Sequence, residues 1–415
     1  MSEGKQYLPC PDNIAIIGGG RWARVLTEVL CEIVPPYVKL SLYSLHNIES
    51  ISVWARTKGL DERIQLLSEL PQSLNGSSTA VIVVNAARDH EAAVVWAISA
   101  GFPVLVEKPI ALTSASSQRL ADMALRNNVC IAAAHVFLFA SYLDKFAKVV
   151  SDAGNIKALK VHWTDPRNEK RYGEQKQYDS SLPIYADSMP HVLSIIGTLL
   201  PDLPYKCELK RLLRGGAFLE IELMFGDTPC HICLERNSDD RRRFIEATVE
   251  SKTIRLDFSK EPGIISDGAV SMVGDPDWDR RQRPVAQMLT AFLKLVVSGE
   301  YDSRLNMGIG LRACQVIDKI SDKYGSAMKP WLLDRLSSNR AIDDDIRYAL
   351  HEMLQSEGRL LPSIVDKQIE SIWQQFSGVE RARLLTELYE AQKPIDVFKN
   401  LAAINDNHIT LKGVL

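Results

Sequence analysis

Residues 13–23 read NIAIIGGGRWA, and this stretch decides the fold of the N-terminal part of the chain. Asn13 to Ile17 form a short apolar run typical of a buried strand, and Arg21 to Ile33 repeat apolar residues with helical spacing. Gly18, Gly20 and Ala23 between them give the pattern GxGxxA: a tight turn, a close approach of backbone to a pyrophosphate, and a small residue where helix packs on strand. We therefore expect a dinucleotide site here, with a glycine turn of some other α/β fold as the alternative.

The rest of the chain predicts three regions. Strand and helix patterns alternate up to about residue 133, which indicates an N-terminal Rossmann domain, a doubly wound parallel sheet, over residues 1–150. Consecutive strand patterns joined by turn residues, followed by two helices, predict an α+β domain with an open, mostly antiparallel sheet over residues 151–330. Pro330 is expected to open a C-terminal helical extension over residues 331–415, with helices at Asp343–Leu354, Ser363–Phe376, Val379–Tyr389 and Ile395–Ala403.

Composition excludes several classes of function. The 415 residues are 46% apolar and 24% charged, and the formal net charge of -3 gives no reason to expect nucleic acid or a membrane as partner. No apolar run is long enough to span a bilayer, and the N-terminus lacks the apolar core of a signal peptide, so we expect a cytoplasmic protein. Cys230 and Cys233 have CxxC spacing within a predicted strand, where they would point to opposite faces, and we expect no metal site.

The end of the second predicted strand bears on the choice of dinucleotide. An acidic residue there would hold the ribose of NAD, but the sequence has Ser44, Leu45, His46 and Asn47. Arg21 and Arg56 lie close enough in sequence to be candidate phosphate partners. The pattern favours NADP over NAD, while ordinary loop polarity is an equally good explanation of Ser44 and His46.

Three segments of the N-terminal region, the glycine turn among them, carry a resemblance to a known family. They are Gly18–Ala23, then Asn85-Ala86 with His90 behind the fourth strand, and then AGFPVLVEKP at residues 100–109, which ends in Glu107-Lys108-Pro109. Asp187 and His191 form a DxxxH element in the second domain. Over residues 12–325 the chain resembles the glucose-fructose oxidoreductase / inositol dehydrogenase / MocA family, which implies an NAD(P)-dependent oxidoreductase with its active site between the two domains.

The resemblance implies a role for each of these residues. Lys108 and His191 would be catalytic, Lys108 as a cation beside the substrate oxygen and His191 as the group that exchanges the hydroxyl proton. Asp187 shares a helix face with His191 and would orient it or bind substrate. The residues expected to contact the cofactor are Gly18, Gly20, Arg21, Trp22, Ala23, Ser44, His46, Asn85, His90, Glu107 and Lys108.

Each of these residues also has a purely structural interpretation. Lys108 could be a surface lysine, His191 a helix histidine without a catalytic task, and His90 the residue that opens its helix. Asp187 could cap a helix whose first turn holds Pro190. His135 and Tyr142 sit near the domain junction without a specific signal.

The chain departs from the family pattern where substrate would lie. Residues 180–186 read SSLPIYA where relatives are glycine-rich, and HVFLF at residues 135–139 lacks the usual Arg-Phe-Pro-like residues. A plain sugar or inositol is therefore in doubt, and a ketone or imine of a biosynthetic pathway becomes a candidate. The charged run at residues 164–171 and the aromatic side chains Trp163, Tyr172, Tyr178 and Tyr185 could line a pocket or form a solvated loop.

Other functions and partners stay open at this point. The fold could serve a non-catalytic NADP-sensing regulatory protein, or a hydrolase or lyase that uses transient oxidation with tightly bound NAD. The trio Lys108, Asp187 and His191 favours the enzyme, because a sensor has no chemical need for it. We expect a small-molecule substrate and a homo-oligomer, with the amphipathic helices of residues 331–415 docking on their own or a neighbouring subunit or recruiting a carrier protein.

Overall fold

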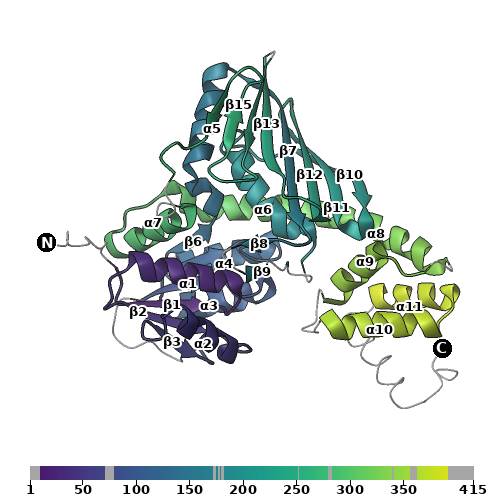
Figure 1. Cartoon of the computed structure of the whole chain (residues 1–415), viewed down its shortest axis with the longest axis horizontal. Helices are drawn as coiled ribbons and strands as arrows, with labels where there is room; N and C mark the ends of the chain where they lie inside the picture. The colour runs from purple at the N-terminus through teal and green to yellow at the C-terminus, as the bar shows by residue number, and fades with distance from the viewer. Residues whose placement is uncertain are drawn as a thin grey trace.

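The computed structural model describes residues 10–70, 79–171, 174–175, 178, 182–250, 252–278, 283–338, 341–355 and 362–390. Two sheets dominate this part of the chain, a parallel one near the N-terminus and a larger mixed one above it in Figure 1, and a group of helices lies to one side. Among the described residues, no helix combines the length and the apolar character needed to cross a membrane.

The first sheet is a Rossmann sheet, as predicted. Its six strands are all parallel and have the order β3-β2-β1-β4-β5-β6. The chain adds strands to one side of β1 and then to the other, so the topological switch point lies between β1 and β4. The strands are β1 Asn13–Ile17, β2 Lys39–Tyr43, β3 Ile64–Leu67, β4 Thr79–Val83, β5 Val104–Glu107 and β6 Ile131–Ala134. Helices cover both faces: α1 Arg21–Ile33, α2 Ile48–Thr57, α3 His90–Ser99 and α4 Ser114–Arg126. Because ligands bind beyond the carboxyl ends of such strands at the switch point, the turns after β1, β4 and β5 define the candidate site.

The second sheet has eight strands in the order β10-β11-β12-β7-β13-β14-β15-β16. Every pair is antiparallel except β12 with β7, so the predicted open, mostly antiparallel sheet is confirmed. The strands are β7 Ile156–Pro166, β10 Lys206–Leu213, β11 Phe218–Phe225, β12 Thr228–Ser238, β13 Arg243–Val249, β14 Lys252–Asp257, β15 Ile264–Ser266 and β16 Ser271–Val273, with a separate small ribbon of β8 Lys170–Arg171 and β9 Glu174–Gln175. Buried and partly buried side chains alternate along β11 and most of β12, as expected for a sheet with one covered face.

Four helices join the two sheets. They are α5 Ser141–Ala153, α6 Ile184–Gly197, α7 Pro284–Ser298 and α8 Met307–Ser337. Helix α7 returns to the first domain and lies beside α1 in Figure 1, where its Leu289 and Phe292 share a core with Leu26. Helix α6 carries the DxxxH element and packs with α8 against the second sheet. It lies on the side of that sheet that is turned toward the Rossmann domain (Figure 1).

The C-terminal helices belong to the same core as the second sheet. Helix α8 continues through Pro330, so the predicted opening of a new region at this residue is wrong. Helices α9 Asp344–Gln355, α10 Pro362–Gln375 and α11 Gly378–Glu390 follow, close to the predicted ranges, and the fourth predicted helix, Ile395–Ala403, lies outside the described residues. A Cβ on Gly215 would stand 2.1 Å from the carbonyl oxygen of Asp345, so α9 packs directly on the turn between β10 and β11. The described part of the extension, up to residue 390, therefore docks on its own chain.

Candidate active site

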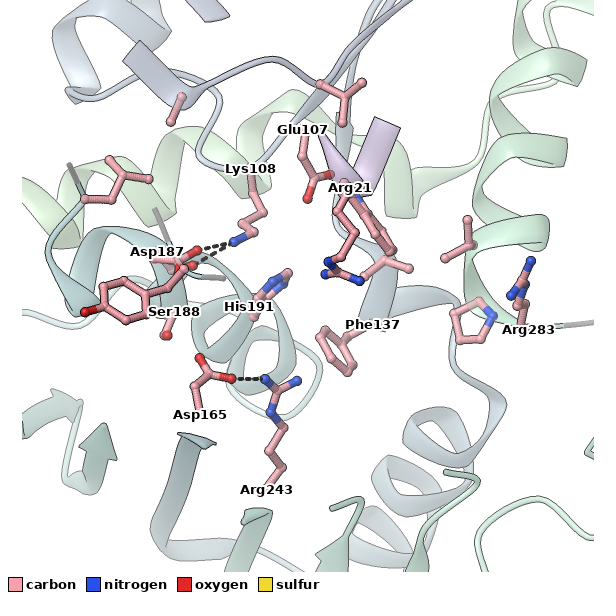
Figure 2. A pocket seen from close by; sticks show the side chains of 18 of the residues that line it. Arg21, Glu107, Lys108, Phe137, Asp165, Asp187, Ser188, His191, Arg243 and Arg283 are labelled. Carbon is pink, nitrogen blue, oxygen red and sulfur yellow. Dashed lines mark hydrogen bonds and ion pairs between the residues drawn. The ribbon is translucent and has the colours of Figure 1, made fainter. Parts of the chain in front are cut away.

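A cleft of about 1030 Å³ lies between the two domains. It begins at Arg21 and Trp22, the first residues of α1 after the glycine turn, and extends over the turns after β4 and β5 to helix α6 and strands β7 and β13 of the second domain. Figure 2 shows side chains that line it. Among the residues expected to form the site, those that line it are Arg21, Trp22, Asn85, His90, Glu107, Lys108, Asp187 and His191. The fold thus brings together residues that are up to 170 positions apart in sequence.

The glycine turn is shaped to accept a phosphate group. Gly18 has φ +142°, and a Cβ there would stand 2.6 Å from the carbonyl oxygen of Val84, so only glycine fits. Gly20 is the N-cap of α1 and makes no side-chain cap, and a Cβ at this position would have no atom within 4 Å. The first amides of α1 therefore face open space, which suits a pyrophosphate, while Ala23 is fully buried against the sheet.

The polar residues after β2 brace this turn. The Asn47 side-chain amide donates to the carbonyl oxygen of Gly19 at 2.7 Å, and the Ser44 hydroxyl bonds to the side-chain oxygen of Asn47. His46 and Arg56 are exposed, and none of Ser44, His46 and Arg56 is among the described residues that line the cleft. Ser44 thus supports the glycine turn through Asn47 and does not line the cleft, whereas its sequence position predicted a contact with the cofactor.

Lys108 forms the centre of the site. It follows β5, and its peptide bond to Pro109 is cis. Its ammonium donates to the Asp187 carboxylate at 2.6 Å and to the Asp187 carbonyl oxygen at 2.9 Å (Figure 2). The side chain is only 13% exposed, so Lys108 is not a surface lysine.

Asp187 has two cationic partners. Helix α6 begins at Ile184 with Pro183 as its N-cap, so Asp187 lies within the first turn rather than at the cap position expected from Pro190. One carboxylate oxygen accepts from Lys108, and the other accepts from the guanidinium of Arg236 on β12 at 2.9 Å. Two cations on one carboxylate fix its orientation.

His191 lies one helical turn after Asp187 and faces the cleft. Its ring stacks on Trp163 with a centroid distance of 5.5 Å and meets the edge of Phe137 at 5.1 Å. Its Nδ1 has no hydrogen-bond partner within the described residues. Burial and the charges of Lys108 and Arg243 hold the pKa of His191 well below its usual value. The imidazole is therefore neutral near pH 7 and able to accept a proton.

Two more predicted residues lie beneath Lys108. Burial raises the pKa of Glu107 to about 7, against the opposing effect of the Lys108 charge. The His90 ring contacts the carbonyl oxygens of Pro109 at 2.8 Å and Asn85 at 3.1 Å, so it connects the turns after β5 and β4. A neutral imidazole has one N–H, so only one of these contacts is a hydrogen bond, and burial lowers the pKa of His90.

Sequence reasoning missed part of the second domain's contribution. Asp165 and Arg243 form an ion pair of 2.6 Å beside His191, and the guanidinium of Arg243 lies 3.8 Å from the centroid of Trp163. Asp165 belongs to the charged run at residues 164–171, for which the sequence allows either a place in the pocket wall or a solvated loop. No sequence pattern points to Arg243.

The four aromatic residues considered together with that charged run lie in different parts of the structure. Trp163 and Tyr178 line the cleft, Tyr185 instead packs on Tyr324, and Tyr172 lies outside the described residues. Tyr142, like His135, is buried and is not among the described lining residues; its hydroxyl donates to Glu261 at 3.2 Å. No group of His, Cys, Asp and Glu in the described part of the chain has the makings of a metal site.

Comparison with known families agrees with this geometry. Residues 13–135 match a family model described as an oxidoreductase family with an NAD-binding Rossmann fold. The predicted resemblance to the Gfo/Idh/MocA oxidoreductases is confirmed. The match covers the glycine turn, the Glu107-Lys108-Pro109 segment and the turns between them. A comparison with curated protein sequences found no match.

Solved structures extend the likeness to the second domain. UDP-N-acetylglucosamine 3-dehydrogenase from Acidithiobacillus ferrooxidans aligns with a TM-score of 0.60 and 16% identity, over 74% of this chain and 95% of that one. Myo-inositol dehydrogenase from Lactobacillus casei, solved with NAD(H) and myo-inositol, aligns with a TM-score of 0.57 and 16% identity, over 74% and 92%. An oxidoreductase from Agrobacterium radiobacter, solved with NAD+, L-tartaric acid and magnesium, aligns with a TM-score of 0.58 and 14% identity, over 75% of this chain and 95% of that one. At these identities the likeness shows the shared two-domain fold alone.

Proposed function

We propose that the protein is an NAD(P)-dependent oxidoreductase that moves a hydride between the nicotinamide and a C–OH/C=O or imine carbon of a small sugar-like or biosynthetic substrate. The observation that carries the proposal is the convergence of the Lys108–Asp187 pair and the neutral His191 on the cleft that begins directly after the glycine turn. Residues 1–150 would hold the dinucleotide, residues 151–330 the substrate, and residues 331–415 would buttress the second domain.

The side chains of the site have complementary tasks. The first amides of α1 and the glycine turn would hold the dinucleotide, which would supply the hydride donor or acceptor when bound. The Lys108 ammonium, oriented by Asp187, stabilises negative charge on the substrate oxygen. His191 accepts the hydroxyl proton through a ring nitrogen when an alcohol is oxidised, and its lowered pKa keeps it in the required neutral form. Asp187, His191 and Lys108 are therefore proposed as the catalytic residues.

Within this proposal we expect NADP to be preferred and NAD to be accepted. Residues 44–47, directly after β2, include no acid to hold the ribose 2′-hydroxyl of NAD. Arg21 lines the dinucleotide side of the cleft, as does Lys58, which is paired with Glu28 at 3.1 Å. The family description and the Lactobacillus structure name NAD, which supports the broader assignment. Titrating the protein into NADPH and into NADH, and following the change in nucleotide fluorescence, gives the two dissociation constants. Their ratio decides between NADP and NAD.

The substrate side of the cleft is polar and aromatic. Asp165 and Arg243 present a carboxylate and a guanidinium, and Trp163 forms the wall on which His191 rests. A substrate with several hydroxyl or carbonyl groups matches these hydrogen-bonding partners. We propose a free small molecule as substrate, acted on in the cytoplasm by a homo-oligomer.

A substrate screen on wild type and Lys108→Ala tests the function. Sugars, nucleotide sugars, ketones and cyclic imines are offered with NADP+ or NADPH, and absorbance at the nicotinamide band is followed. Lys148→Ala, on the exposed face of α5, serves as the matched control. Turnover that Lys108→Ala abolishes and Lys148→Ala retains supports the proposal.

Other outcomes point to the alternatives. Nucleotide binding without turnover on any substrate class favours a dinucleotide sensor. Cofactor that survives desalting, with turnover but no net release of reduced nucleotide, favours a redox-assisted hydrolase or lyase. Full activity in Lys108→Ala removes that residue from the mechanism.

A further inference from the structure

Behind the catalytic pair lies a buried cation that the proposed mechanism does not use. Arg236, on β12, is 1% exposed, and its guanidinium contacts the far side of the Asp187 carboxylate. It also donates to the carbonyl oxygen of Leu182 at 2.7 Å, directly before α6 begins. Arg236 therefore holds both the side chain of Asp187 and the start of the helix that carries it.

A buried guanidinium needs several partners, because removing its charge from water is costly. Two of them come from helix α9 of the C-terminal extension. Arg236 donates to the Tyr348 hydroxyl at 3.2 Å. The carboxyl of Glu352, one turn later, interacts electrostatically with the same guanidinium, and burial raises the pKa of Glu352 to about 7. Both residues are buried.

The rest of this network fixes those two residues in turn. The Tyr324 hydroxyl on α8 donates to the Glu352 carboxylate at 2.7 Å. The Tyr178 ring lies 4.7 Å from the Arg236 guanidinium and 6.1 Å from the Tyr348 ring. The contacts thus run without interruption from Lys108 through Asp187 and Arg236 to α9.

We propose that helix α9 completes the active site from outside the two-domain core: Tyr348 and Glu352 hold Arg236 in place, and Arg236 positions Asp187 against Lys108. This inference rests on the proposed function, in which Asp187 and Lys108 are catalytic. Tyr348, Glu352 and Arg236 are positioning residues, because none of them is among the described residues that line the cleft, and they act on it through Asp187, which Arg236 contacts. The extension is then a component of the catalytic apparatus as well as a cover for the second sheet.

The reactivity of the Lys108 amine measures this positioning without any substrate or nucleotide. Trace labelling of the full-length protein with acetic anhydride, read by mass spectrometry, gives the modification of Lys108 relative to the exposed Lys148 in the same sample. The wild-type ion pair protects Lys108. In Tyr348→Phe and Glu352→Gln, Asp187 is held less firmly, and we expect labelling of Lys108 to rise about threefold, the change that follows from weakening an ion pair by ~0.6 kcal/mol.

The matched control is His351→Ala. His351 is on the same helix but bonds Asp366 of α10 at 2.8 Å, so its loss loosens the extension without touching Arg236. We expect a lower melting temperature with unchanged labelling of Lys108. Wild-type labelling in both folded network variants overturns the proposal, and so does an equal rise in His351→Ala. Should Glu352→Gln fail to fold, Tyr348→Phe, which loses one hydroxyl, decides alone.

The labelling result is independent of the proposed function. A protein that binds no dinucleotide can still show the rise in Lys108 reactivity, in which case the network is real and the assigned chemistry is wrong. Where a substrate is found, Tyr348→Phe should lower kcat and leave KM for the dinucleotide unchanged.

Discussion

Replacing Asp187 with asparagine removes the charge that two cations share. Asparagine keeps the shape of the side chain, but Lys108 and the buried Arg236 both lose their ionic partner. Breaking a buried ion pair by removing one member costs about 3–5 kcal/mol, and the remaining hydrogen bonds of asparagine place this variant near 3 kcal/mol. For a domain of this size each kcal/mol lowers Tm by about 2–4 °C, so we expect a decrease of roughly 6–12 °C.

Thermal unfolding of matched variants measures the effect. Asp152→Asn is the control, because its pair with Lys148 is 3.6 Å long and both side chains are well exposed. Its cost should stay below about 0.5 kcal/mol. In the double variant Asp187→Asn with Arg236→Met the unpaired buried cation is gone, so the loss should be smaller than the sum of the two single losses by about 2 kcal/mol. Equal Tm values for Asp187→Asn and Asp152→Asn, or additive losses in the double variant, would refute the reasoning.

Three further predictions follow from the site. Gly18→Ala should lower the unfolding free energy by about 1–3 kcal/mol, because its Cβ meets backbone, while Gly20→Ala should keep the wild-type Tm and weaken binding of NADH in a fluorescence titration. The folded pKa of Glu107 lies above its usual 4.5, at about 7, so the folded state holds the extra proton between these values and stability falls as pH rises through them; Glu107→Gln should therefore gain in Tm relative to wild type between pH 5 and pH 8, and an equal difference at both pH values would contradict the shift. Because the pKa of His191 is well below 6.5, wild-type kcat/KM for oxidation should stay level from pH 7.5 to pH 6, and His191→Asn should lower kcat about 10²-fold or more; a loss of rate in wild type centred on pH 6.5 would show an ordinary histidine instead.

The sequence predicts the Rossmann half of the molecule well because local signals coincide there. Strand, glycine turn and helix follow one another within residues 13–33, and each has its own chemical signature. The short strand Ile64–Leu67 and helix α5 were not predicted: four residues carry little periodicity, and only a single 3-10 turn separates α5 from β6. Pro330 misled because a proline usually ends a helix, whereas packing of Met328 and Leu332 into the core keeps α8 continuous.

The site divides in the same way. Lys108, Asp187 and His191 stand in short motifs, so their residue types and spacing could be read directly from the chain. Arg236 and Tyr348 carry no local pattern, because their importance arises from partners 49 and 112 positions away. Such contacts are set by sheet register and helix docking, which single-sequence periodicity does not encode.

In the proposed complex a pyridine nucleotide lies across the carboxyl ends of the first sheet, and Lys108 and His191 converge on its reactive ring. A crystal structure of the protein with NADPH or NADH tests it most directly through the distances from the nicotinamide C4 to the space between these two side chains. We expect the pyrophosphate against Gly18 and Gly20, and room for a substrate carbon about 3–3.5 Å from C4 with its oxygen in reach of the Lys108 ammonium. A nucleotide bound elsewhere, or a nicotinamide ring that faces away from Lys108 and His191, would contradict it.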